Sequence, residues 1–364
     1  MDAVFSRADL LFGIQTVQNV VSTRAALPVL SNILLEVEGT EARLSATDLE
    51  IGIRCKVPVL SSEEGGSVTI HAKRFSEIVR ELPDSEIRIT TDPSSTVAIT
   101  CERSRFKILG LPPEDFPPFP EIEGGERVVI EQRSLKDMIK KTIFATSTEE
   151  TRYALNGIFM EFKEGTLSMV ATDTRRLALV KTPISSDMEP RSAIVPTKAF
   201  QELSRILEEG IVEIRLFGNQ ISFSTDSVTL VSRLIEGQFP KYELVIPKSY
   251  DRKARTRTED LLKATRRVSL VSTEKASIVK IEFQPDRMIL SASDPDIGEA
   301  VEEINASLEG DPLTMGYQAR YITDVLRNIE QEEICFELTG ALSPAVLKPV
   351  DDDSYLCLIM PVRT

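Results

Sequence analysis

Few side chains in this chain have the type and spacing that catalysis requires. The single histidine, His71, lies in "VTIHAKRF" without a partner at a fixed spacing, which favours a structural role. The four cysteines, Cys55, Cys101, Cys335 and Cys357, form no C-x-x-C pair, so neither a disulfide framework nor a thiolate zinc site is expected. The sequence contains no G-x-x-x-x-G-K-[ST] phosphate loop and no G-x-S-x-G nucleophile elbow. We therefore expect no catalytic residues, no metal site and no cofactor.

A run of three carboxylates, Asp351 to Asp353, is the remaining candidate for metal chemistry, because hard cations prefer oxygen ligands. The run lies between the apolar segments "AVLKPV" and "YLCLIM", and this placement favours a solvated hairpin loop instead. The N-terminus mixes charges among its apolar residues, and no stretch is apolar enough to span a bilayer. Together with the dispersed cysteines, these features predict a cytoplasmic protein without membrane contact.

Charge is distributed unevenly along the chain. A net charge of −14 would normally argue against nucleic acid as a partner. However, basic residues outnumber acidic ones in five of six segments with helical periodicity, which are residues 7–22, 73–81, 133–146, 197–207, 257–272 and 319–329. One charged helix face is commonly just solvated. The same bias in five equivalent helices predicts a positive surface that could face phosphates, with acidic strands elsewhere.

One short motif occurs three times and indicates an internal repeat. Its copies are "SATDLEIGIR" at residues 45–54, "VATDTRRLAL" at 170–179 and "SASDPDIGEA" at 291–300. A helical pattern precedes each copy, and a strand and a second helix follow it. Aspartate at a tight turn can bond the backbone two residues on, so the first and third copies are interpreted as scaffold. Only the middle copy continues with two arginines and a leucine.

These repeats predict three α+β domains, at residues 1–122, 123–247 and 248–364. Segments such as "EIRIT", "VEIRLFGNQISFST" and "EICFEL" alternate apolar and polar residues, as half-buried antiparallel strands do. Residues 111–126 are rich in proline and glycine, and residues 237–255 combine prolines with charge. We expect both segments to be linkers that do not pair centrally in a sheet.

The whole chain resembles the bacterial DNA sliding clamp family, the beta subunit of the replicative DNA polymerase III. The resemblance is carried by "LPVLSNILLEV", "ATDLEI", "RYALNGIFME", "VATDTRRLAL", "GQFPKY", "VIPK" and "LIMPVR". It implies three repeated clamp domains per chain, with helices lining the inside and antiparallel sheets outside. Two such chains would close into a six-domain ring as a homodimer. The implied function is to encircle duplex DNA without sequence preference as a processivity factor, which is not an enzyme.

The resemblance also implies a set of partners. These are the replicative DNA polymerase, the clamp loader, and other polymerases and repair proteins that carry clamp-binding peptides. Ring opening by a separate ATP-driven loader agrees with the missing phosphate loop. Two other interpretations stay open at this point. One is an enzyme of an unfamiliar β-rich class, and the other is a clamp-like ring with a specialised, non-replicative repair role.

Partner peptides of this family insert into a pocket between the second and third domains. An apolar lining of leucine, valine, proline and methionine suits such a pocket, and Arg176 could hold a carbonyl or carboxylate. Core packing is the alternative role for Leu177 and Leu358. The family commonly has Gly-His where this chain has Thr174-Arg175. The matching positions are Leu155, Thr172, Thr174, Arg175, Arg176, Leu177, Pro240, Val245, Gln318, Tyr321, Leu342, Pro344, Leu358, Met360, Pro361, Val362 and Arg363.

Two further sets of residues follow from the resemblance and the charge pattern. The segments "SRFKIL" and "SLVSTEK" resemble the family's subunit contacts. They predict that Phe106 and Ile108 pack against Leu270 and Val271 of the partner subunit in a heterologous contact that the two-fold closes. The candidates for contact with DNA phosphates are Arg24, Lys136, Lys140, Lys198, Arg205 and Arg266.

Overall fold

The computed structural model of the protein describes residues 1–21, 27–120, 124–185, 189–272 and 277–363. The chain divides into two compact units. The first comprises Met1–Arg133 and Lys198–Leu234, and the second comprises Ser134–Thr197 and Ile235–Thr364. The division passes through the middle repeat, so the strands of this repeat contribute to a sheet in each unit.

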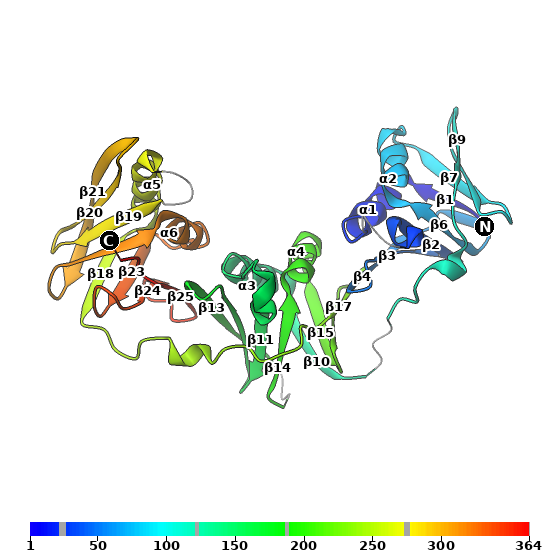
Figure 1. Ribbon diagram of the computed structural model, residues 1–364. Coiled ribbons are helices and arrows are strands. Elements are labelled where there is room, and N and C mark those ends of the chain that lie inside the picture. Colours follow the sequence, from blue (N-terminus) through cyan, green and yellow to red (C-terminus); the bar gives the residue numbers. More distant parts are fainter. Residues whose placement is uncertain (22–26, 121–123, 186–188, 273–276, 364) are drawn as a thin grey trace. The chain divides into compact units, whose positions relative to one another are not determined.

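The first unit contains a five-stranded and an eight-stranded antiparallel sheet (Figure 1). The five-stranded sheet has the order β5-β1-β7-β8-β9, with bounds Ser61–Glu64, Asp2–Ser6, Glu86–Thr91, Thr96–Cys101 and Ser104–Leu109. The eight-stranded sheet has the order β10-β15-β16-β17-β4-β3-β2-β6, with bounds Glu126–Glu131, Ile211–Phe217, Gln220–Ser224, Val228–Arg233, Ile51–Pro58, Glu41–Thr47, Asn32–Glu38 and Gly66–His71. Pairing of β17 with β4 joins strands of the middle repeat to strands of the first.

Helices α1 (Arg7–Val17), α2 (Ala72–Glu81) and most of α4 (Thr197–Ile206) belong to the first unit. The hydroxyl of Ser6 accepts the backbone N–H of Asp9 at 3.1 Å and so caps the start of α1. Helix α1 packs against β3 and β4. Gly13 permits this close approach, because a Cβ there would lie 2.9 Å from Cγ1 of Val57.

The second unit contains one twelve-stranded antiparallel sheet with the order β14-β11-β12-β13-β25-β24-β23-β18-β21-β20-β19-β22. Their bounds are Arg191–Pro196, Gly157–Lys163, Thr166–Thr172, Arg176–Pro183, Tyr355–Ile359, Ala345–Pro349, Glu333–Leu338, Arg252–Arg257, Gly298–Glu309, Arg287–Asp294, Ile278–Phe283 and Leu313–Gln318. Helix α3 (Gln132–Ile143) begins in the first unit and continues into the second, and α5 (Thr258–Val268) packs against α6 (Ala319–Leu326). Pairing of β13 with β25 joins the middle and third repeats.

The repeated motif forms the expected turn. The carboxylate of Asp48 accepts the backbone N–H groups of Glu50 and Ile51, at 3.0 and 2.7 Å. Asp173 accepts those of Arg175 and Arg176, both at 2.9 Å. In the third copy, the carboxylate of Asp294 accepts the N–H of Asp296 at 3.0 Å. The prediction that this aspartate bonds the backbone two residues on is therefore confirmed in all three copies.

The first two copies share a further feature that the third lacks. Thr47 Oγ1 and Thr172 Oγ1 each donate to a carbonyl four residues on, at 2.9 and 2.7 Å. The residue after the aspartate has a positive φ in both, +78° at Leu49 and +75° at Thr174. The threonine bonds hold this left-handed backbone in place even though neither residue is glycine. The third copy has serine in place of threonine and lies in the hairpin between β20 and β21.

The six predicted helices and the α+β class are confirmed, although the helices end earlier than the periodicity suggests. Helix α1, for example, ends at Val17 whereas the pattern extends to Ser22. His71 ends β6 and directly precedes α2. The acidic run Asp351 to Asp353 lies in the turn between β24 and β25, which confirms the hairpin interpretation.

The prediction for the second linker is wrong at its C-terminal end. Strand β18 begins at Arg252, inside the segment 237–255, and pairs with both β21 and β23. The prolines of this segment, Pro240 and Pro247, come before the strand. Alternation then resumes, with Ala254 and Thr256 buried between exposed or half-buried neighbours, so nothing prevents central pairing.

The four cysteines are free and buried. Burial raises the pKa of the Cys55 and Cys335 thiols to about 11 and that of Cys357 to about 12. Thiolate is thus disfavoured at these positions, and the cysteines behave as small apolar residues. No helix among the described residues is long and apolar enough to cross a membrane.

Candidate functional site

Most residues expected to hold partner peptides gather in the second unit, where the C-terminal segment meets the middle turn. Strand β25 pairs with β13, with Leu358 opposite Leu177. The ladder continues past the end of β25, because the N–H of Met360 donates to the carbonyl of Arg175 at 2.8 Å. The N–H of Val362 then donates to Gly316 O on β22, also at 2.8 Å. These bonds fix residues 360–362 between the turn and β22.

An apolar cluster lies under this segment. Its buried members come from four neighbouring strands and are Val170, Leu177, Leu179, Val346 and Leu358, together with Tyr242 of the linker. The ring of Phe239 stacks on Phe159 with centroids 4.9 Å apart, and so attaches the linker to the same sheet. Leu177 and Leu358 are each only 3% exposed. Their observed role in the chain is therefore core packing.

Arg176 connects the turn to α6 and to the end of α3. Its guanidinium donates to Asp173 at 3.1 Å, to Asp324 at 2.7 Å and to the carbonyl of Phe144. The same group lies over the Tyr321 ring at 4.7 Å and the Phe144 ring at 5.3 Å. Arg176 is 6% exposed. The carbonyl and the carboxylates that it binds are internal, so in this structure it positions the turn and α6.

The remaining candidates differ in accessibility. Exposed residues are Thr174, Arg175, Pro240, Val245, Leu342, Met360 and Arg363. Half-buried residues are Gln318, Tyr321, Pro344, Pro361 and Val362, whereas Leu155, Thr172, Arg176, Leu177 and Leu358 are buried. The large apolar side chains among the exposed candidates are Val245, Leu342 and Met360, which are 54%, 64% and 42% exposed. We call these three side chains the apolar triad.

Sequence reasoning missed two groups beside this site. Arg152 donates to the Thr174 hydroxyl at 2.5 Å and to the carbonyl of Asp173 at 3.4 Å, and so braces the turn from outside. Asp324 accepts from Arg176 and lies within 4.0 Å of Arg320 and Arg327. The spacing of Arg320, Asp324 and Arg327 on one helix face could have revealed the second group. No local signal points to the first.

Two tyrosines near the site have raised pKa values. Burial raises the pKa of Tyr321, and the charge of Asp173 adds to this, while Arg176 and other cations oppose it. Burial also raises the pKa of Tyr242, whose hydroxyl lies 3.3 Å from the Glu161 carboxylate. Both phenols are neutral at physiological pH and can donate a hydrogen bond.

The candidates for contact with DNA lie on helices and are accessible. Lys136 and Lys140 on α3 and Arg266 on α5 are exposed in the second unit. Lys198 and Arg205 on α4 are exposed in the first. Arg24 falls outside the described residues.

Several of these cations pair with carboxylates of the chain itself. Lys198 lies 2.5 Å from Asp48, and Lys140 lies 3.2 Å from Glu330. The two lysines are 49% and 46% exposed, and ion pairs of solvated cations contribute little to stability, so phosphate can replace the carboxylate at small cost. Lys141 behaves differently. It is 13% exposed and lies over the Tyr355 ring at 5.4 Å, and so contributes to packing rather than to the surface charge.

The residues expected at the subunit contact are exposed or half-buried apolar groups. Strand β9 is an edge of the five-stranded sheet, and it carries Phe106, which is 38% exposed, and the half-buried Ile108. In the second unit, Leu270 is 78% exposed in a 3-10 helix, Ser269–Val271, and Val271 is half-buried. An unpaired edge strand with apolar side chains is a surface that commonly pairs with another chain.

Comparison with known proteins gives consistent matches over the full length. Models of the DNA polymerase III beta subunit match its N-terminal domain to residues 1–120, its central domain to 129–241 and its C-terminal domain to 243–363. The beta sliding clamp of Vibrio cholerae is 32% identical over 365 residues, which cover 100% of both chains.

Solved structures show the same similarity. The DNA polymerase sliding clamp from Bacillus subtilis matches with a TM-score of 0.97 and 30% identity, over 100% of this chain and 99% of that one. A sliding clamp from Pseudomonas aeruginosa bound to griselimycin matches with a TM-score of 0.96 and 34% identity over 100% of both chains.

The network around Arg176 yields a prediction for stability. Replacing Arg176 with alanine leaves the partly buried carboxylates of Asp173 and Asp324 without their main partner. We expect Arg176→Ala to lower the free energy of unfolding by about 2–4 kcal/mol, measured by urea denaturation. The neighbouring Arg175 is exposed, so Arg175→Ala is the matched control and should stay within about 0.5 kcal/mol of the unchanged protein. Equal losses in the two variants would contradict a structural role specific to Arg176.

Proposed function

The chain belongs to the family of the DNA polymerase III beta subunit, the bacterial sliding clamps, and we propose that it acts as a closed ring of two copies around duplex DNA. It is a DNA sliding clamp of replication, and its relatives favour this role over a specialised repair role. The observation that carries the proposal is the succession of three clamp domains in one chain. Two copies supply six such domains, enough to surround a duplex.

We propose further that the protein has no catalytic activity of its own. A processivity factor holds a polymerase on its template, which requires topology and contact rather than bond chemistry. The chain has no phosphate-binding loop motif, so a separate clamp loader would supply the ATP-driven opening step. We propose that it works in the cytoplasm, together with the DNA and the polymerase that it would bind.

Duplex DNA would be held mainly by enclosure. The candidate cations Lys136, Lys140, Lys198, Arg205 and Arg266 are exposed, and some already have carboxylate partners. Their attraction to phosphate is therefore modest, falls with salt and carries no sequence information. Such contacts suit a protein that must move along DNA.

This mechanism predicts retention by topology. Protein loaded on circular duplex DNA by a clamp loader and ATP should stay bound at salt concentrations that abolish ordinary phosphate contacts. Cutting the circle once should release all of it, because the ring slides off the ends. Gel filtration of labelled protein with the DNA before and after cutting measures this. Equal retention on cut and intact circles would rule out enclosure as the mechanism.

The ring requires two identical contacts between subunits. We propose that Phe106 and Ile108 on β9 pack against Leu270 and Val271 of the partner subunit, which buries apolar groups that a single chain exposes. The two contacts are equivalent by the two-fold axis, so a change in one segment weakens both.

Replacing Leu270 and Val271 together with alanine should convert the dimer to monomer at micromolar concentration, as measured by light scattering. Two large apolar side chains are lost from each of the two contacts. Ile297→Ala is a control, because Ile297 is also exposed and apolar in the same unit but lies in the turn between β20 and β21, outside the 3-10 helix Ser269–Val271. A monomeric unchanged protein under these conditions would overturn the proposed contact.

Partner peptides would bind at the surface that carries residues 360–362 and the other two members of the apolar triad, Val245 and Leu342. The turn at Asp173, the linker and the C-terminal segment meet there, and the buried apolar cluster packs beneath them. We assign direct contact to the exposed and half-buried candidates. The buried ones, Leu155, Thr172, Arg176, Leu177 and Leu358, would shape the surface from below.

This division of roles can be measured with a peptide from the replicative polymerase. Leu342→Ala and Met360→Ala should each weaken its binding by about 30-fold, because an apolar anchor at the centre of a contact is worth roughly 2 kcal/mol. Fluorescence anisotropy gives the affinity, and light scattering verifies that the dimer is intact. Ile297→Ala serves again as the control and should not change affinity. Unchanged affinity in both triad variants would move the partner site elsewhere.

A further inference from the structure

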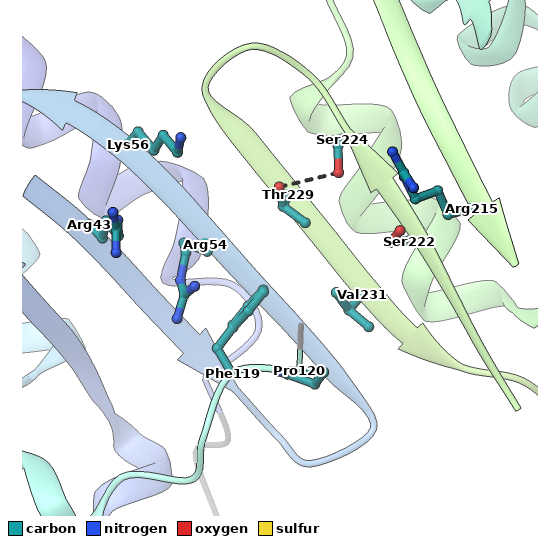
Figure 2. Close-up of a pocket in the computed structure, with 10 residues that line it drawn as sticks. All are labelled: Arg43, Arg54, Lys56, Phe119, Pro120, Arg215, Ser222, Ser224, Thr229 and Val231. Carbon is teal, nitrogen blue, oxygen red and sulfur yellow. Dashed lines mark hydrogen bonds between the residues drawn. The ribbon is translucent and has the colours of Figure 1, made fainter. Parts of the chain in front are cut away.

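The first unit contains a cavity of about 370 Å³ that the proposed clamp function does not use. It lies on the eight-stranded sheet where β3 and β4 meet β15, β16 and β17 (Figure 2). Its side chains point away from α1, because the alternate residues Leu44 and Val57 are the ones that approach that helix. A volume of this size holds a few side chains of a ligand.

The wall of the cavity is cationic. Arg43, Arg54, Lys56 and Arg215 line it, and none of the described residues that line it is acidic. Hydroxyl groups complete the floor. The Thr229 hydroxyl donates a hydrogen bond to the Ser224 hydroxyl, with the two oxygen atoms 3.3 Å apart, and Figure 2 draws this bond.

One aromatic ring closes an edge of the cavity. Phe119 reaches in from the linker and lies between Arg54 and Val231 in Figure 2. The Arg54 guanidinium lies 4.2 Å from the ring centroid. The ring can approach the strand closely because the residue next to it is Gly52. A Cβ at that position would be only 3.2 Å from the ring.

Cations of the cavity already form ion pairs with glutamates of the chain. Arg43 lies 3.2 Å from Glu41, and Lys56 lies 3.9 Å from the same side chain. Arg54 lies 4.0 Å from Glu36. The glutamates are at least 39% exposed, so these pairs are solvated and exchange readily with an incoming carboxylate.

The place of the cavity corresponds to that of the apolar cluster in the second unit. Counted from the aspartate of the repeated turn, Gly52 and Arg54 occupy the positions of Leu177 and Leu179. Both sites lie on strands that join two repeats, β4 with β17 and β13 with β25. The same backbone arrangement thus has an apolar surface in one unit and a basic, open surface in the other.

We propose that this cavity binds an acidic, extended segment of a partner protein. Its carboxylates would pair with the four cations, and an apolar side chain of the segment would pack on Phe119. Nucleic acid fits less well, because a continuous phosphate chain would have to pass the exposed glutamates Glu38 and Glu41 beside the cavity. The proposal stands on the first unit alone and does not depend on the peptide site of the second.

A short fluorescein-labelled peptide in which glutamate alternates with leucine is a direct probe. Titrated against the full-length protein at low salt, it should bind, and the version with glutamine for glutamate should not. Arg54→Gln and Arg215→Gln should each weaken binding about tenfold, since each removes a charge-assisted contact. Lys56→Gln, at an exposed position, is a further variant should either arginine prove necessary for folding.

Two control variants show whether the peptide binds in this cavity. Arg233→Gln removes an exposed arginine that lies on β17 outside the cavity and should leave affinity unchanged. Met360→Ala should also leave it unchanged, which separates this site from the one in the second unit. Absence of binding, or equal affinity in the unchanged protein and all cavity variants, would overturn the proposal. Displacement of the peptide by oligothymidylate at a lower concentration than by unlabelled peptide would overturn it in favour of nucleic acid.

Discussion

Pairing of strand edges across repeat boundaries is the interaction on which the rest of the structure depends. One repeat alone would leave unpaired N–H and C=O groups on β4, and the next would leave them on β17. In the first unit these two strands satisfy each other, and in the second unit β13 and β25 do the same. Each pairing also brings together side chains from distant parts of the sequence. Both candidate sites lie on these joints, because there two repeats meet on one continuous surface.

The repeated turn explains how the same fold can carry different side chains at the two places where repeats pair, β4 with β17 and β13 with β25. Its geometry depends on the aspartate and threonine side chains and on backbone groups, which are the same in the first and middle copies. The following residues are free to differ. Ile51 follows in the first copy, whereas Arg176 in the middle copy binds α6 and the end of α3. The two extra arginines of the middle copy therefore have separate roles, because Arg176 is internal and Arg175 is exposed.

The sequence predicts local features of this protein well and long-range contacts poorly. Helices, hairpins and the aspartate turn depend on residues a few positions apart, and these predictions are confirmed. The start of β18 at Arg252 is not evident, because its pairing with β21 and β23 is decided by residues about 50 and 80 positions away. Burial of Leu177 and Leu358 likewise depends on the pairing of β13 with β25. The basic cavity has no local signal, since Arg54, Phe119 and Arg215 come from three separate segments.

Ion pairs within the chain follow from its acidic composition, and they affect how readily the protein can move along DNA. A net charge of −14 supplies many carboxylates, and several lie against the exposed helix cations, as Asp48 does at Lys198 and Glu202 at Arg205. A cation with such a partner releases fewer counterions when it meets phosphate, so it binds DNA less tightly than a bare one. In the proposed ring, such weak and interchangeable contacts would keep the interaction energy with DNA nearly equal from one base pair to the next. A ring that is retained by enclosure loses nothing by this, since its residence on DNA does not depend on the strength of any one contact.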